Sequence, residues 1–388
     1  MRWTRTTRRS SAWVVAALAV AAVAAPAGPA DAASPRWRES VLPAEGVGVD
    51  GLAAPGPATT WAAATRVVQE GKGTRFEQTL FTTDPAAPGG WREVPLDPAG
   101  AGSRANAIDA SCDGDALLVG DYDSSLGAVV TQHAHDGTWS LAAAPVPEHT
   151  LYGGLLQVDT RTTDDAWAVG WAQIDDGTVP DPDGGPSQQL SHHEPLVEHW
   201  NGAAWQNTSL PQVAPSWALT DVEALAPDDV WAVGQTDDDL QPVLMHFDGT
   251  AWTRTPTPRY AGVQGELLQL AARDGTVWAV GSAKQTPDAT PAGLVLRLSD
   301  GVWRQVLLPR GTGRLTAAAA TPAGIATLGT DPDGSFGLLL TATGTTDLHL
   351  PADVHLTSLL ARGTTLATGG LRPATATEPA RPVVLTTG

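Results

Sequence analysis

The sequence predicts an all-β protein, a β-propeller built of four-stranded antiparallel blades. Three observations lead to this prediction. The chain of 388 residues contains 41 glycines and 31 prolines, too many for long helices, yet its 15 tryptophans can fill a core. A short apolar segment recurs at intervals of 40 to 64 residues, and most copies are followed by a tryptophan beside a turn. A period near 50 residues that holds several short strands is typical of a propeller blade.

The apolar segment predicts the second strand, b, of each blade. Three copies are nearly identical: Asp165–Gly170, Asp229–Gly234 and Thr276–Gly281, each with a central Trp-Ala-Val-Gly. Weaker copies keep the same spacing, namely Thr60–Ala64, Ala116–Gly120, Ile325–Gly329 and Leu366–Gly369. These seven copies predict seven blades.

A second repeated element predicts the outer strand, d. It consists of a Gly-containing turn, a Trp and, six residues later, a Pro, as in Trp139 to Pro145 and Trp303 to Pro309. Asp-Gly and Asn-Gly between two apolar runs favour tight hairpins, because both turn residues can adopt positive φ. In the sixth repeat Thr345 stands where the others have Trp. Each repeat therefore predicts four strands, a to d.

The two ends of the chain predict how the ring closes. The last repeat offers strands near 356–361, 364–369 and 381–387 and no fourth strand. The missing strand is expected at the other end, because Arg36–Pro43 carries Trp37 with the same offset to proline. We expect this segment to pair beside the C-terminal strand, which removes two exposed sheet edges.

Residues 1–32 are typical of a secretory signal peptide, and residues 33–388 are expected to form a single propeller domain. Four arginines precede an apolar run, Ala12–Ala25, and Ala30-Asp31-Ala32 resembles a cleavage site. Sec and Tat export both stay open. No membrane anchor is expected, because no lipobox cysteine or C-terminal apolar segment follows. The mature chain is expected to be released outside the cell.

Charge and cysteine content exclude several classes of partner and cofactor. Cleavage after Ala32 leaves 19 basic and 41 acidic side chains, a net charge of −22. Such an acidic protein is a poor ligand for nucleic acid or anionic membranes. The single Cys112 excludes an internal disulfide and a cysteine zinc site, and we expect it to be a free thiol.

The repeats resemble a known group of proteins. The segments Asp165–Gly170 and Asp229–Gly234 are similar to those of secreted actinobacterial proteins built of Asp-Val-Trp-Ala-Val-Gly propeller repeats. The chain from Pro35 to Gly388 also resembles the lectin-type seven-bladed propellers of those bacteria, including the propeller subunit of umbrella toxin particles. This resemblance implies a carbohydrate-binding role and, as one case, a targeting subunit of a secreted antibacterial assembly.

Strand direction assigns the connections to two faces. The a–b and c–d turns share one face, and the b–c and d–a connections share the other, which we call the b–c/d–a face. Connections that differ between similar blades are where a propeller can acquire a binding site. Acidic and aromatic residues gather there, and carboxylates and aromatic rings are the groups that bind sugar hydroxyls and pyranose faces. The predicted ligand-binding residues are Tyr152, Trp171, Asp175, Asp176, Trp217, Asp237, Asp238, Asp239 and Tyr260.

No metal or other cofactor is expected. Calcium binding by the segment 171–194, which is expected to be a long loop, stays open as an alternative. It contains alternating carboxylates beside glycine, as calcium loops do, followed by His192, His193 and Glu194. The full EF-hand pattern is absent. His133, His199 and His246 each lie six residues before a d-strand Trp, so we expect them to be structural repeats and not a triad.

No catalytic residue is assigned, because neither a nucleophile elbow nor a phosphate-binding loop occurs in the chain. The predicted function is a non-enzymatic, lectin-like binding propeller that recognises a glycan or a protein partner. Two alternatives stay open. One is a carbohydrate-active enzyme of the glycoside hydrolase type, since paired carboxylates follow no spacing rule. The other is a pure protein-interaction scaffold.

Overall fold

The repeats fold into antiparallel groups of four strands. In the fourth repeat β14 (Trp217–Ala226), β15 (Asp229–Thr236), β16 (Pro242–Phe247) and β17 (Trp252–Arg254) follow one another both in the chain and in the sheet. The β16–β17 turn holds Gly249 at a φ of 86°, a left-handed conformation that glycine adopts without steric cost. The four-strand unit expected from the sequence is confirmed.

The computed structural model describes residues 35–388 with the exception of 46, 57, 72, 99–101, 112–113, 182–184, 261, 310 and 352. The expected signal peptide, the thiol of Cys112 and Asp183 of the calcium alternative lie outside the described residues. Pro88–Gly90 forms a short 3-10 turn. No helix in the described part of the chain is long and apolar enough to span a membrane.

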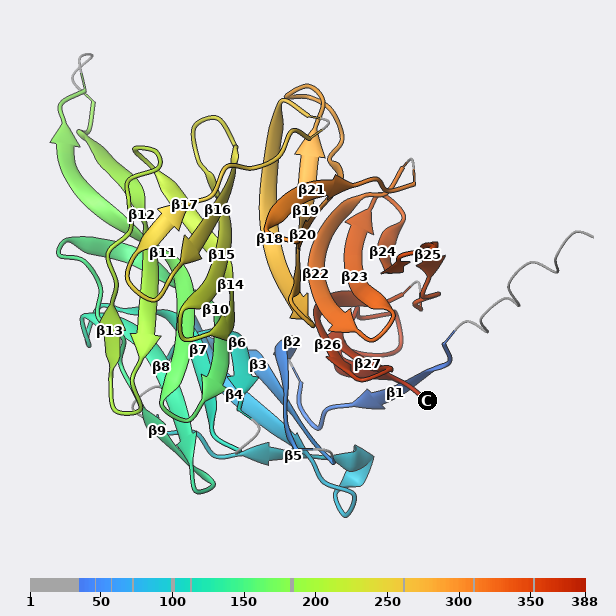
Figure 1. Ribbon diagram of the computed structural model, residues 1–388. Helices are drawn as coiled ribbons and strands as arrows, with labels where there is room; N and C mark the ends of the chain where they lie inside the picture. Colours follow the sequence, from blue (N-terminus) through green and yellow to red (C-terminus); the bar gives the residue numbers. More distant parts are fainter. Residues whose placement is uncertain are drawn as a thin grey trace, which may run out of the picture. The chain divides into compact units, whose positions relative to one another are not determined.

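Five sheets have four strands each, and the β14–β17 sheet is one of them (Figure 1). The other four are β2 (Val47–Gly56), β3 (Thr59–Glu70), β4 (Gly73–Thr83) and β5 (Trp91–Val94); β18 (Gln264–Arg273), β19 (Thr276–Lys284), β20 (Ala292–Ser299) and β21 (Val302–Val306); β22 (Arg314–Thr321), β23 (Gly324–Asp331), β24 (Gly334–Thr341) and β25 (Gly344–Asp347); and β26 (His355–Arg362), β27 (Thr365–Arg372), β28 (Arg381–Thr387) and β1 (Trp37–Val41).

The sixth sheet has eight strands, which differs from the separate four-stranded blades expected for this part of the chain. Its strands β7 and β10 meet at one register pair, Asp121 and Gly154. Glycine permits this approach, because a Cβ on Gly154 would lie 2.9 Å from the carbonyl oxygen of Gly120. The eight strands are β6 (Ala105–Ala110), β7 (Ala116–Asp123), β8 (Ala128–His135), β9 (Thr138–Leu141), β10 (Thr150–Thr162), β11 (Asp165–Val179), β12 (Gln188–Trp200) and β13 (Trp205–Asn207).

The first strand of each four-strand group contacts the first strand of the next group in chain order, and β26 and β27 contact β2. This succession of sheets, each packed on the next, is a β-propeller with the a strands innermost. Side chains join neighbouring inner strands: the Thr220 hydroxyl donates to the carbonyl oxygen of Leu267 at 2.8 Å, and the Asn106 amide donates to that of Leu155 at 2.9 Å.

Strand β1 closes the last sheet, as expected. It pairs antiparallel with β28 from Trp37 opposite Thr387 to Val41 opposite Val383. The Trp37 indole donates to the carbonyl oxygen of Leu348 at 2.8 Å. The amide of Leu42 continues the pairing with Pro382 at 3.1 Å. The predicted role of Trp37 as the outer-strand Trp of the last blade is confirmed.

Aspartates on the inner strands also hold neighbouring groups together. Asp109 accepts a hydrogen bond from the Thr160 amide at 2.7 Å, and Asp159 and Asp221 accept from amides of the next inner strand in the same way. Burial raises the pKa of Asp109 to about 8 and that of Asp159 to about 6. Burial also raises the pKa values of Asp221 and Glu223 well above their ordinary range. The hydrogen bonds accepted by Asp109, Asp159 and Asp221 thus link neighbouring inner strands of the propeller.

Candidate functional site

A cavity of about 400 Å³ lies where the inner strands β2, β6 and β26 begin, which places it on the b–c/d–a face. We call it the inner-strand cavity. Asp50 and Asn106 reach it from β2 and β6, Thr65 from β3, Phe76 from β4, and Arg104 from the connection before β6. The alternation in β2 explains why Asp50 faces the cavity, since Val47 and Val49 on the other side of the strand are buried.

Hydrogen bonds fix the polar side chains of the cavity. The Thr65 hydroxyl donates to a carboxylate oxygen of Asp50 at 2.7 Å and accepts from the Ala105 amide at 3.1 Å. Asn106 donates to a carboxylate oxygen of Asp121 at 2.9 Å. The Arg104 guanidinium lies 4.0 Å from the Phe76 ring centroid. The cavity therefore presents a fixed carboxylate, an amide and a stacked cation.

Burial controls the ionisation of Asp50 in the cavity and of Asp121, which is hydrogen-bonded to Asn106 beside it. It raises the pKa of Asp50 to about 6, against the lowering effect of the Thr65 hydrogen bonds and of the Arg104 charge. Burial also raises the pKa of Asp121, while Asn106 and Arg104 lower it. Asp50 is consequently charged at neutral pH and becomes a hydrogen-bond donor as the pH falls below about 6.

Asp50, Arg104 and Asn106 were not among the predicted ligand-binding residues. A signal existed for Asp50, because Val47-Gly-Val-Asp50 alternates apolar and small or polar residues, which is typical of a strand with one buried side. No sequence signal shows that the starts of β2, β6 and β26 leave a cavity between them.

Three predicted residues come together beside the cavity, in a group we call the rim network. Tyr152 packs edge-on against Trp171 with ring centroids 5.5 Å apart, and Trp171 lies 4.6 Å from the His193 ring. His193 Nδ1 is 2.9 Å from a carboxylate oxygen of Asp237. The Ser216 hydroxyl donates to the same Asp237 oxygen and accepts from the His193 amide.

The rim network begins close to the inner-strand cavity. Asp121, which Asn106 binds at the cavity, pairs with Gly154 on β10, two residues from Tyr152. The Tyr152 side chain is 48% exposed, so its ring is accessible. His193 and Ser216 are members that the sequence analysis missed as ligand-binding residues, because neither has a neighbour in the chain that indicates the contact with Asp237.

The other predicted residues are more dispersed. Asp176 lies 2.9 Å from His192 Nδ1, and this contact raises the pKa of His192. Asp175 accepts from the Gly177 amide at 2.6 Å within its own strand. Asp239 belongs to a second group in which Gln241 donates to its carbonyl oxygen at 3.0 Å and accepts from the Tyr260 hydroxyl at 3.1 Å. Asp238 lies in the same β15–β16 loop.

Two expectations are wrong in detail. Trp217 is 1% exposed and belongs to a buried cluster with Val222 and Met245, so its side chain fills the core and cannot stack on a ligand. The expected loop from Trp171 to Glu194 is for the most part a long hairpin, because β11 continues to Val179 and β12 begins at Gln188 (Figure 1). Alternating burial of Ala172 and Ile174 extends the strand beyond the blade.

Two of the three repeated histidines, His199 and His246, make the same contacts within their blades, as expected for structural positions. His199 stacks on Trp167 with centroids 4.4 Å apart and lies 2.9 Å from an oxygen of Asp165. His246 repeats the arrangement with Trp231 and Asp229. Among the described residues, no three His, Cys, Asp or Glu side chains come together in a way that could hold a metal ion.

Comparisons with known proteins identify the fold class. No protein-family model matches the chain. No curated protein matches it either. Several solved structures, a β-propeller domain among them, resemble it over most of its length, so the chain belongs to the β-propeller fold class.

Three of these structures illustrate the likeness. Acylaminoacyl peptidase from Pyrococcus horikoshii aligns with a TM-score of 0.57 and 10% identity over 88% of this chain and 52% of that chain, so this chain spans about half its length. The β-propeller domain of the trilobed protease from Pyrococcus furiosus aligns with a TM-score of 0.51 and 7% identity over 88% of this chain and 96% of that chain. YCF48 from Cyanidioschyzon merolae aligns with a TM-score of 0.53 and 13% identity over 90% of this chain and 98% of that chain. At these identities the likeness concerns the fold alone.

Proposed function

We propose that this chain is a secreted, lectin-like propeller that binds a saccharide unit in the inner-strand cavity through non-covalent contacts. The rim network would contact further units of a longer glycan. The observation that carries the proposal is the convergence of Asp50, Arg104 and Asn106 on one cavity of about 400 Å³. That volume falls within the range of about 300–1,000 Å³ found for small-ligand sites.

The chemistry of the cavity suits sugar hydroxyl groups, which both donate and accept hydrogen bonds. Asp50 supplies an acceptor and Arg104 supplies donors, while both N–H groups of Asn106 are already hydrogen-bonded to Asp121 and to the Leu155 carbonyl oxygen. Tyr152 adds an accessible aromatic ring at the rim, and such a ring can pack against the apolar face of a pyranose. A saccharide would therefore meet donors, an acceptor and an aromatic surface on one face.

A glycoside hydrolase is the second candidate, because Asp50 lines the cavity and Asp121 lies next to it, hydrogen-bonded to Asn106. Hydrolysis requires environments that push the two pKa values apart, one acid staying protonated and one carboxylate staying charged. Here burial raises the pKa values of both groups, and among the described lining residues of the cavity Asp50 carries the only carboxyl group. Binding is therefore favoured over catalysis, and release of reducing ends from a bound glycan would reverse that preference.

A protein-binding scaffold is the third candidate. Val179 and Leu190, near the end of the β11–β12 hairpin, are 46% and 44% exposed. Exposed apolar side chains on a projecting hairpin fit a protein partner better than a sugar. Removing residues 177–190 separates the two functions: it would abolish partner capture and leave glycan binding at the cavity intact.

The blade count and export belong to the same proposal. The eight-stranded sheet divides into β6–β9 and β10–β13, each with its own outer strand, and we count these as two blades of a ring of seven. Export is supported by the arginines and apolar run of residues 1–32. N-terminal sequencing of the released protein should begin at Ala33. The role as targeting subunit of an antibacterial assembly rests on the repeat resemblance, and a pull-down from culture supernatant tests it.

A glycan array probed with residues 33–388 tests the saccharide proposal. Asp50→Asn keeps the acceptor for Thr65 and removes the charge, so binding of the selected glycan should weaken about tenfold, as expected for a hydrogen bond to a charged group. Tyr152→Ala should weaken binding of longer glycans more than that of single sugars. Asp136→Asn, in a c–d turn on the opposite face, is the matched control. Failure of every glycan to bind, or equal effects of Asp50→Asn and Asp136→Asn, would contradict the proposal.

A further inference from the structure

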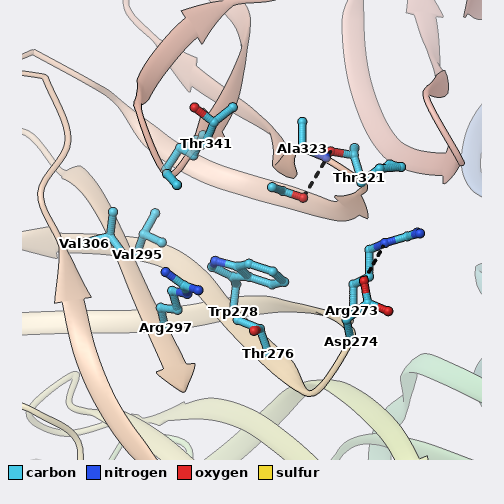
Figure 2. A pocket seen from close by; sticks show the side chains of 14 residues that line it. Arg273, Asp274, Thr276, Trp278, Val295, Arg297, Val306, Thr321, Ala323 and Thr341 are labelled. Atoms are coloured by element: carbon cyan, nitrogen blue, oxygen red, sulfur yellow. Dashed lines mark hydrogen bonds and ion pairs between the residues drawn. The ribbon is translucent and has the colours of Figure 1, made fainter. Parts of the chain in front are cut away.

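A second pocket lies on the opposite face, between the β18–β21 and β22–β25 sheets. Its volume is about 240 Å³, and its walls include Trp278, Arg297, Val306 and Leu340. Figure 2 shows Trp278 and Arg297 side by side on one wall, with Thr341 across the space. We call it the junction pocket.

The equivalent places between other blades are filled by tryptophan. A b-strand Trp packs edge-on against the outer-strand Trp of the next blade at three junctions of the described chain. The centroid distances are 5.4 Å for Trp61 and Trp139, 5.5 Å for Trp167 and Trp252, and 5.3 Å for Trp231 and Trp303.

Trp278 is the next b-strand Trp, but its outer-strand partner is missing. Thr345 pairs with Leu340 on the c strand, as Trp303 pairs with Leu298. Thr345 therefore occupies the tryptophan position of β25 and is too small to reach Trp278. The junction pocket is the space that an indole fills elsewhere in the ring.

The polar groups around Trp278 have changed together with Thr345. In the fourth blade one oxygen of Asp229 lies 2.9 Å from the Trp231 indole nitrogen and 2.9 Å from His246 Nε2. In the fifth blade Thr276 stands in place of Asp229, and Arg297 stands opposite Trp278 as His246 stands opposite Trp231. Two donors, the Trp278 indole and the Arg297 guanidinium, are present without the carboxylate that their counterparts Trp231 and His246 contact in the preceding blade.

The charge of the junction pocket favours an anion although the chain as a whole is acidic. Arg297 and Arg273 both line the pocket, and the Arg297 Cζ atom lies 5.7 Å from the Trp278 ring centroid. Asp274 is the acidic side chain among the described lining residues, and it forms an ion pair with Arg273 at 3.3 Å. Arg297 is thus left to face the ligand.

From these observations we propose that the junction pocket binds an aromatic carboxylate. The aromatic ring takes the place of the missing outer-strand indole against Trp278, and the carboxylate takes the place of Asp229 between the indole nitrogen and Arg297. The volume suits one aromatic group, because it falls below the range of about 300–1,000 Å³ usual for larger ligands. A free aromatic acid and the C-terminal aromatic residue of a peptide share this chemistry.

Calorimetric titration with 3-indolepropionate and with the peptide Gly-Gly-Trp distinguishes the two sources. Saturable binding of either probe supports the site, and the tighter probe identifies the source. Arg297→Gln should weaken binding of the bound acid about tenfold or more while leaving its neutral amide unaffected, because a charge-assisted hydrogen bond is lost. Equal binding of acid and amide by the wild-type protein would overturn the proposed carboxylate contact.

Thr345→Trp provides the decisive variant, because it should complete the Trp pair and abolish binding while raising the unfolding midpoint. Thr346→Trp is the matched control, since the next residue on a strand faces the other side, and it should bind as the wild type does. Unaltered binding by a folded Thr345→Trp variant, or no binding of either probe at millimolar concentration, would overturn the proposal. Glycan binding at the inner-strand cavity should be unchanged in all these variants.

Discussion

Leu42→Ala should destabilise the protein strongly, because Leu42 lies at the seam where the ring closes. It directly follows β1 and is 2% exposed. It belongs to a buried cluster that contains Val47 and Trp91 of the first sheet and Val384 of the last sheet. One side chain therefore packs against both ends of the ring.

The expected loss follows from that burial. Truncating a buried leucine to alanine costs about 2–5 kcal/mol, since both the transfer free energy and a cavity contribute. Domains are stable by about 5–15 kcal/mol, so the substitution removes a large share of the margin. Arg38→Ala in the same strand, with an exposed side chain, should change the free energy of unfolding by less than about 0.5 kcal/mol.

Urea denaturation of the wild type and both variants measures these differences. A midpoint for Leu42→Ala as close to the wild type as that of Arg38→Ala would refute the assignment of β1 as a structural closing strand. A lower midpoint with an unchanged slope would indicate that the folded ring persists and has lost packing energy.

Two further predictions concern buried residues of the inner strands. The raised pKa of Asp109, about 8, means that the folded state keeps a proton that the unfolded state releases above about pH 4, so stability should fall as the pH rises from about 4 to 8. One such group contributes about 1.4 kcal/mol per pH unit, and Asp109→Asn should flatten the decline between pH 6 and 8 by about that amount; equal slopes in urea titrations would argue against a buried neutral carboxyl. Trp217→Ala should lower the free energy of unfolding by about 3–5 kcal/mol and leave glycan affinity unchanged at a temperature where the variant is folded, and selective loss of affinity would show that Trp217 contacts the ligand.

Repeat periodicity predicted the parts of the fold that depend on local pattern. Spacing in the sequence predicts the strands of each repeat, the closing role of Trp37 and the structural role of His199. It does so because equivalent residues of different repeats pack in the same way. The eight-stranded sheet could not be predicted, since it depends on one close approach of Gly154 to β7. Spacing also placed Trp217 at the end of a strand on the b–c/d–a face, but it could not show whether the side chain is exposed at the rim or buried in the core.

The candidate site likewise contains residues that the sequence predicted and residues that it did not. Tyr152, Trp171 and Asp237 were predicted because the repeat pattern assigned them to connections that differ between blades. Tyr152 and Trp171 lie in β10 and β11 instead, and the three residues do form one network through His193. Alternation in the sequence places Asp50 opposite the buried Val47 and Val49, but nothing in the local sequence marks that position as functional. Its position follows from three strands that begin at different points in the chain. Such convergence appears only when the ring is assembled.

Hydrogen–deuterium exchange with and without the glycan selected on the array tests the proposed saccharide site most directly. The proposal predicts that the ligand slows exchange at the starts of β2 and β6 and at residues 150–156, with no change in the turns at 273–276 and 321–324 on the opposite face. Protection confined to those opposite turns, or protection spread evenly over all sheets, would contradict binding at the inner-strand cavity.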